Sequence, residues 1–218
     1  MKIRYAFMLI TFAAFFSSCE KDPIVSTPDM VGLSKVTYYP IITVSGSSIV
    51  AIVNGTSFTD PGVKAIAGTT DVPVVTSGDL NTSEDGVYTI NYTATNSDGF
   101  SSTASRTVVV YSTTDDAASH DLSGTYLRPA TGVTSTWTRI APGVYRVQNP
   151  GGAASGTDLI VVAVNPAGYQ ITVPSQRASD GSISSTNSEA YTNSTPATYK
   201  WRFLNPTYGT GIRTFVKQ

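Results

Sequence analysis

The stretch VYTINYTA, residues 87–94, carries the clearest pattern in this sequence of 218 residues. Apolar or aromatic side chains occupy every second position, and threonine or asparagine fills most of the positions between them. A period of two is that of a β-strand with one buried face. We expect Tyr88, Ile90, Tyr92 and Ala94 to share that buried face.

Short runs rich in valine, isoleucine and threonine lie on both sides of this strand, with turn residues between them. In the first half these runs are residues 41–44, 49–53, 72–75 and 106–111. Pro73 marks the third run as an edge strand, because proline cannot donate to a ladder. No segment after residue 20 keeps a 3.6-residue period, so the sequence predicts an all-β protein.

The second half repeats this pattern with shorter connections. Candidate strands are residues 124–128, 135–140, 144–148, 159–164, 169–173, 182–184, 198–204 and 212–217. Pairs such as Pro142-Gly143 and Asp180-Gly181 mark tight turns between several of them. Consecutive short connections predict an antiparallel meander, either a small barrel or a sandwich.

Four motifs in the first half occur in a fixed order: TDPGVKA at 59–65, GVYTINY at 86–92, Asp98-Gly99, and RTVVV at 106–110. This series resembles a bacterial immunoglobulin-like domain that is repeated in surface proteins and crystal toxins. The resemblance covers about residues 36–112 and implies a seven-stranded sandwich that serves as a spacer or adhesion module. It brings no catalytic residues with it.

The N-terminus has the features of an export signal. Lys2 and Arg4 precede an apolar run at 6–16, which is too short to span a bilayer as a mature helix. The sequence FSSC at 16–19 resembles the lipobox of bacterial lipoproteins. It implies a signal peptide at 1–18, a lipidated Cys19, and a tether at 19–35. The alternative is an ordinary signal peptide with a chance cysteine.

The acidic stretch after the cysteine, Glu20-Lys21-Asp22, resembles the surface-export signal of Bacteroidota outer-membrane lipoproteins. Residues 113–120 are small and polar, and we interpret them as a flexible linker between the two domains. The domain at 121–218 resembles the C-terminal domain of uncharacterised Bacteroidota surface lipoproteins, which often occur beside polysaccharide-uptake systems. That resemblance rests on GTYLR at 124–128, GVYRV at 143–147 and RTFVK at 213–217.

Composition excludes several classes of function. The 14 Lys and Arg nearly balance the 15 Asp and Glu, so no basic excess is available for nucleic acid. One cysteine excludes a disulfide framework and a multi-cysteine zinc site, and one histidine excludes a histidine-rich metal centre. We expect no cofactor and no nucleic-acid partner.

Aromatic side chains of the second half are the candidate ligand contacts, because they can stack on sugar rings while polar neighbours bond the hydroxyls. Tyr199, Trp201 and Phe203 alternate along one strand, which fits a core face better than a binding face. The sequence pattern does not show whether the Trp137 side chain points into the core or toward solvent. Tyr191 and Tyr208 lie in stretches expected to be loops, at 184–197 and 205–211. We therefore predict a glycan site at Trp137, Tyr191 and Tyr208, with Asn193 and Asn205 as companions.

Catalysis is not expected. His120 lies in the predicted linker, where nothing would hold a nucleophile against it. The acids of the second domain, Asp121, Asp158, Asp180 and Glu189, form no convincing pair for glycoside hydrolysis. Asp60, Asp71, Asp85 and Asp98 could supply oxygen ligands to calcium, but the Asp-Pro-Gly and Asp-Gly sequences fit turn chemistry better.

Together these patterns predict a non-enzymatic outer-membrane lipoprotein with a surface-exposed position. The favoured function is an accessory glycan-binding component of a polysaccharide-uptake system. Its partners would be the membrane, through Cys19, and a polysaccharide or oligosaccharide. The alternative is a structural module that packs against other envelope proteins without binding glycan.

Overall fold

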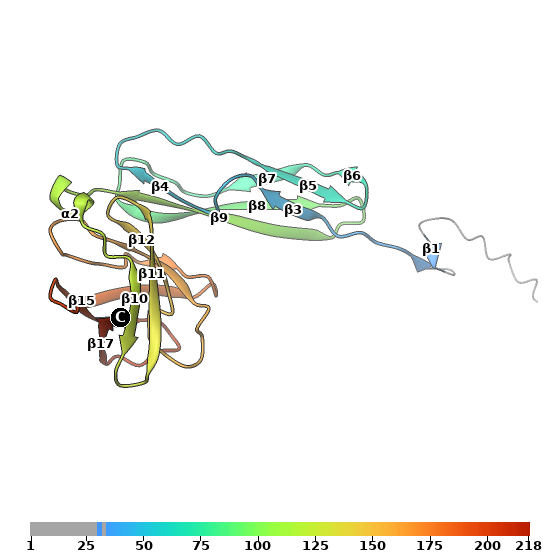
Figure 1. The fold of residues 1–218 in the computed structure, drawn as a ribbon. Helices are drawn as coiled ribbons and strands as arrows, with labels where there is room; N and C mark the ends of the chain where they lie inside the picture. The colour runs from blue at the N-terminus through green and yellow to red at the C-terminus, as the bar shows by residue number, and fades with distance from the viewer. Residues whose placement is uncertain (1–29, 32–33) are drawn as a thin grey trace, which may run out of the picture. The chain divides into compact units, whose positions relative to one another are not determined.

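The computed structural model describes residues 30–31 and 34–218 (Figure 1). The chain forms two units, residues 1–38 and 39–218. In the first, β1 (Met30–Val31) pairs antiparallel with β2 (Ser34–Lys35). The predicted signal peptide and Cys19 lie outside the described residues. Within the described part, no helix has the length and hydropathy needed to cross a membrane.

The N-terminal sandwich, residues 39–112, contains two sheets built from the predicted Val, Ile and Thr runs and from two strands that were not predicted, at 63–67 and 70–71. The smaller sheet has the order β3 (Ile41–Val44), β5 (Val63–Ala67), β6 (Thr70–Asp71), and the larger has the order β4 (Ile49–Val53), β9 (Ser101–Tyr111), β8 (Gly86–Thr95), β7 (Val74–Ser77). Strand β4 pairs parallel with β9, whereas the other pairs are antiparallel. The all-β prediction is confirmed, and β7 is an edge strand as Pro73 indicated.

Strand β8 contains the stretch that opened the sequence analysis. Ile90, Tyr92 and Ala94 are buried and Tyr88 is half-buried, so the predicted face does point into the sandwich. Ile90 and Tyr92 pack with Val108 of β9 in one hydrophobic cluster. Side chains of the smaller sheet, including Ile42 and Val63, close this cluster from the other side.

A buried arginine ties the two sheets of the sandwich together. Arg106 of β9 is 0% exposed, and its Nε lies 3.3 Å from a carboxylate oxygen of Asp60 and 3.2 Å from the Tyr92 hydroxyl. Its other nitrogens donate to the carbonyls of Ser45 and Ser47. The Asp60 carboxylate also accepts from the Gly62 N–H, as expected for a turn residue. Asp60 is therefore engaged by protein donors.

The barrel, residues 121–218, is one eight-stranded antiparallel sheet that is nearly closed. Its order is β13 (Ile160–Val164), β12 (Val144–Gln148), β11 (Val133–Ala141), β10 (Gly124–Arg128), β17 (Ile212–Lys217), β16 (Thr198–Leu204), β15 (Ile183–Thr192), β14 (Gln176–Arg177). Two four-stranded meanders are thus joined where the first strand, β10, pairs with the last, β17. This settles the open choice in favour of a barrel.

The gap in this barrel lies between β13 and β14, and one side chain fills part of it. The Gln176 Nε2 donates to the Val162 carbonyl, and its Oε1 accepts from the Val162 N–H, each at 2.8 Å. A primary amide presents the same donor and acceptor as a backbone peptide. Gln176 therefore takes the place of a strand residue beside Val162.

Aromatic rings fill the barrel interior. Trp137, Tyr199, Trp201 and Phe203 are each at most 2% exposed, and they stack or cross with neighbouring rings at centroid distances of 4.5–6.3 Å. The preference for a core face at Tyr199, Trp201 and Phe203 is confirmed. Trp137 belongs to the same core, because it is stacked on Trp201 with a centroid distance of 5.5 Å.

The predicted linker, residues 113–120, is ordered. It contains α2 (Asp115–Ser119), whose first turn is capped by Thr114 accepting from the Ala117 N–H. Ala117 is fully buried, and Thr113 donates to the Asn165 carbonyl of the barrel. The expectation of a flexible linker was wrong because these contacts fix the segment against the barrel.

The outer face of two barrel strands packs on the sandwich. Along β12, Tyr145 and Val147 point into the barrel, while Val144 belongs to a second cluster with Val109 and Tyr111 of β9. The same alternation on β13 sends Val162 and Val164 to that second cluster. The apolar core of residues 39–218 therefore consists of three clusters: one in the sandwich, one in the barrel and one between them.

Two strand predictions in the barrel need correction. Residues 184–197 were expected to be mostly loop, yet β15 extends to Thr192. Residues 169–173 were expected to be a strand, but only Thr172 makes an isolated bridge, to Val164. The first error arose because β15 is rich in Ser, Thr and Asn and is exposed along much of its length, so it lacks apolar alternation.

Candidate functional site

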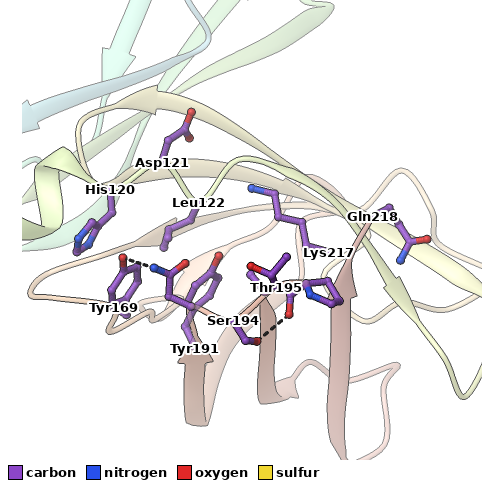
Figure 2. Close-up of a pocket in the computed structure, with 12 residues that line it drawn as sticks. His120, Asp121, Leu122, Tyr169, Tyr191, Ser194, Thr195, Lys217 and Gln218 are labelled. Atoms are coloured by element: carbon purple, nitrogen blue, oxygen red, sulfur yellow. Dashed lines mark hydrogen bonds between the residues drawn. The ribbon is translucent and has the colours of Figure 1, made fainter.

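A surface groove of about 510 Å³ lies at one edge of the barrel, where the segment after α2, the loop before Thr172 and the end of β15 meet. Figure 2 shows the residues around it. We call it the ring groove because aromatic rings form one wall. Its lining consists of His120, Asp121, Leu122, Tyr169, Tyr191, Asn193, Ser194, Thr195, Pro196, Ala197, Lys217 and Gln218.

Three flat rings form the aromatic wall. His120 is stacked on Tyr169 with a centroid distance of 4.0 Å and an interplanar angle of 7°. Tyr169 is in turn stacked on Tyr191 at 5.7 Å, again with an angle of 7°. Three nearly parallel rings from three separate chain segments therefore form one stack beside the groove, with Tyr169 in the middle.

Each ring is held by a hydrogen bond. His120 Nδ1 lies 2.9 Å from the Gly168 carbonyl, which can only accept, so Nδ1 carries the proton. The Asn193 amide donates to the Tyr169 hydroxyl at 2.6 Å. The Tyr191 hydroxyl lies 3.3 Å from that of Tyr126 in the core. The wall is thus fixed before any ligand arrives.

Polar groups surround the rings. The Lys217 ammonium lies 5.8 Å from the centroid of Tyr126. The backbone N–H and the hydroxyl of Ser123 lower the pKa of the Asp121 carboxyl, with help from the charges of Arg139 and Lys217, so this group stays ionised at neutral pH. Burial raises the pKa of Tyr191, which keeps its hydroxyl protonated. The groove therefore offers amide, hydroxyl, ammonium and carboxylate groups.

A second hollow of about 580 Å³ adjoins the same rings. We call it the side hollow, and it is lined by Tyr169, Gln170, Ile171, Glu189, Ala190 and Tyr191. The Glu189 Oε1 accepts from the hydroxyls of Thr186 at 2.6 Å and Thr172 at 3.3 Å. Tyr169 and Tyr191 line both spaces.

Of the three predicted ligand contacts, only Tyr191 lies in the ring groove. Trp137 is 2% exposed inside the barrel, which contradicts its assignment to a surface site. Tyr208 lines a different hollow, with Asp158 and Asp180, and its ring packs so closely on Gly151 that a Cβ there would clash. The structure therefore does not bring the three residues together.

The sequence analysis missed Tyr169 and misjudged His120. Tyr169 was placed in a strand, and His120 in a flexible linker. Asn193 was named as a companion and does lie in the groove, whereas Asn205 is buried and donates to Ser182 and Ser184. Pro166-Ala167-Gly168 before Tyr169 was the one available signal, because a turn there lifts the next residue out of the sheet.

Metal ligands do not gather in the described residues: no group of three His, Cys, Asp or Glu side chains is placed to hold an ion. Asp60, one of the carboxylates considered for calcium, faces Arg106 and Tyr92 instead.

Comparison with known proteins supports the first half of the fold. Residues 42–110 match the family described as "Bacterial surface protein, Ig-like domain". The N-terminal sandwich is therefore similar to bacterial surface Ig-like domains. Comparison with curated proteins gives no match.

Solved structures give distant similarities. The lipoprotein BT2262 from Bacteroides thetaiotaomicron is 21% identical over 82% of this chain and 100% of that one, with a TM-score of 0.44. From Clostridium perfringens ZmpB, the structure of CBM51-2 in complex with GlcNAc and INT domains is 18% identical, with 70% and 30% of the two chains covered and a TM-score of 0.32. The structure of its M60 catalytic domain with CBM51-1 and CBM51-2 is 14% identical, with 85% and 22% covered and a TM-score of 0.33. This chain thus spans less than a third of either ZmpB structure.

Proposed function

We propose that this protein is a lipid-anchored cell-surface protein that binds a glycan in the ring groove. The observation that carries the proposal is the parallel pair of Tyr169 and Tyr191 in the wall of a polar groove. A sugar ring has an apolar face that packs on an aromatic ring and hydroxyls that need hydrogen-bond partners.

Polar groups of the groove supply those partners. The side chains of Asn193 and Ser194 are exposed, and Lys217 reaches in from the end of β17. The ring wall is already ordered by its own hydrogen bonds, so little conformational entropy is lost on binding. The groove volume of about 510 Å³ falls within the range of small-ligand sites.

The rest of the chain fits a role at the cell surface. Lipidation of Cys19 would anchor the protein, and the Ig-like domain would serve as a spacer that carries the barrel away from the membrane. Within a polysaccharide-uptake system such a protein would be an accessory binder that retains glycan without cleaving it. Radiolabelled palmitate should appear on the wild-type protein, and label that persists on Cys19→Ala would refute the anchor.

The binding proposal is tested by affinity electrophoresis of the Cys19→Ala protein in gels that contain starch, xylan, mannan, arabinogalactan or mucin glycans. We expect retardation on at least one glycan. Asn193→Ala and Tyr169→Ala should weaken the affinity for it by about tenfold, the effect of one lost hydrogen bond or stacking contact. Thr214→Ala, an exposed change on β17 outside both hollows, is the matched control.

Two results would overturn the proposal: no retardation on any glycan, or full affinity in both groove variants with melting temperatures that show intact folding. Release of reducing ends from a retarded glycan would overturn the statement that binding occurs without cleavage.

A second candidate is a protein-interaction module of the cell envelope. It is favoured by apolar side chains on the Ig-like domain, where Tyr39 is 58% exposed, Ile41 73% and Phe100 42%. The Tyr39 and Phe100 rings are 5.1 Å apart, so they form one patch. Crosslinking in intact cells tests it: Ile41→Glu should reduce captured envelope proteins, and unchanged capture would argue against this role.

A further inference from the structure

The tyrosine pair of the ring groove, Tyr169 and Tyr191, borders two hollows and not just one. Tyr169 and Tyr191 line both the ring groove and the side hollow. Both rings are only half-buried. The two hollows therefore share this pair of rings.

We propose that the ring groove and the side hollow form one open-ended cleft that binds an internal stretch of a linear saccharide chain. This inference rests on the glycan binding proposed above and specifies its form. A site for a terminal sugar would be a closed pocket of one-ring size. Here the rings lie in the middle of the lining, with polar groups on both sides.

Strand β15 gives the scale of the cleft. Glu189 lines the side hollow and Asn193 lines the ring groove, four positions further along the chain. A fully extended chain would place these positions at most about 13 Å apart. The cleft continues past Asn193 to Pro196 and Lys217. A ligand that contacts both ends must therefore be longer than a single sugar ring.

The two ends differ in chemistry. The side hollow offers the exposed Gln170 and the Glu189 carboxylate, whose Oε1 is already held by the hydroxyls of Thr186 and Thr172. The ring groove offers the Lys217 ammonium and the Asn193 amide. A carboxylate accepts hydrogen bonds from hydroxyl groups and repels other acidic groups. The sugar that binds at the side hollow is therefore an uncharged one. The ring groove also contains the Asp121 carboxylate, so the ends differ in the Lys217 ammonium, which only the ring groove has. This difference gives the chain a preferred direction.

A length series tests the inference. Calorimetric titration of the Cys19→Ala protein would use ladders from disaccharide to octasaccharide, prepared from starch, xylan or mannan, whichever retards the protein in gels. We expect the affinity to rise by about tenfold or more along the ladder and then to level off. Gln170→Ala and Glu189→Gln should cut the ratio of octasaccharide to disaccharide affinity by about fivefold or more, while Asn193→Ala should weaken every length. Thr214→Ala should match the parent.

The outcomes separate the two proposals. If the disaccharide binds as tightly as the octasaccharide and Asn193→Ala still weakens it, the extended cleft is wrong and glycan binding in the ring groove stands. If Gln170→Ala and Glu189→Gln leave the length dependence unchanged, the side hollow takes no part and the inference fails. If no member of any ladder binds and no polysaccharide retards the protein, the proposed function itself fails.

Discussion

At the scale of single residues, Asp60 pairs with the buried Arg106, although its Asp-Pro-Gly sequence indicates only a turn. Partial burial works against its ionisation. The Tyr92 hydroxyl at 2.5 Å, the Gly62 N–H and the Arg106 charge outweigh that effect, and the pKa of Asp60 lies below its usual value. Arg106 is 0% exposed and needs this counter-charge, since an unpaired buried guanidinium is costly.

Asp60→Asn should therefore destabilise the protein by about 1–3 kcal/mol at neutral pH, less than a fully buried pair because the carboxylate is partly exposed. A lowered folded-state pKa adds stability above the unfolded value of about 4, and this contribution is lost as the pH falls through the folded value. Urea unfolding at about pH 7 and about pH 3 should show a difference between parent and variant that shrinks in acid.

Asp71→Asn is the control for that measurement, because Asp71 pairs with Lys64 on the surface, with both side chains more than half exposed. It should change stability by less than about 0.5 kcal/mol at either pH. Equal stability of Asp60→Asn and parent at neutral pH would refute the structural role.

At the scale of elements, one side-chain amide, that of Gln176, bridges the gap in the barrel between β13 and β14. Gln176→Ala would leave both the N–H and the carbonyl of buried Val162 without the partners they now have. Each such loss costs about 1–3 kcal/mol, so we expect a drop of about 2–4 kcal/mol in unfolding free energy and faster amide exchange at Val162. Gln148→Ala, which loses one exposed bond to Thr157, should cost less than about 1 kcal/mol. Similar losses of unfolding free energy in both variants would contradict the role of Gln176 in bridging the gap between β13 and β14.

The strands also show which parts of the fold could be predicted from the sequence. Alternation in β8 and in β16 was enough to predict strands and their buried faces, because each strand has one core face. It failed for β15, whose polar residues carry no such alternation, and Tyr191 was therefore placed in a loop. It also failed for Trp137, since alternation tells which residues share a face but not which face the barrel encloses.

The candidate site was harder to predict for a related reason. His120, Tyr169 and Tyr191 come from three segments that are 22 or more positions apart, and their stacking depends on α2 and on the turn at Gly168. No local pattern encodes such a meeting. Of the three rings, only Tyr191 was predicted as a ligand contact. It was placed in a loop, although it lies near the end of β15.

At the scale of the whole molecule, residues 39–218 should behave as one cooperative unit. Val144 and Val162 project from the barrel into a cluster with Val109 and Tyr111 of the Ig-like domain, and all four are at most 5% exposed. Domains joined by a large apolar contact unfold together, whereas domains joined only by a linker unfold separately. Calorimetry of the parent should therefore show a single transition.

Val144→Asp should split that transition, because it places an unpaired carboxylate in the apolar contact without touching the interior of either domain. The barrel and the Ig-like domain would then melt at separate temperatures, each with its own unfolding enthalpy. Arg146→Ser is the matched control, since Arg146 lies on the same outer face of β12, two positions further along, outside the cluster. A single transition in Val144→Asp, merely shifted to lower temperature, would mean that α2 and its capping contacts couple the domains instead.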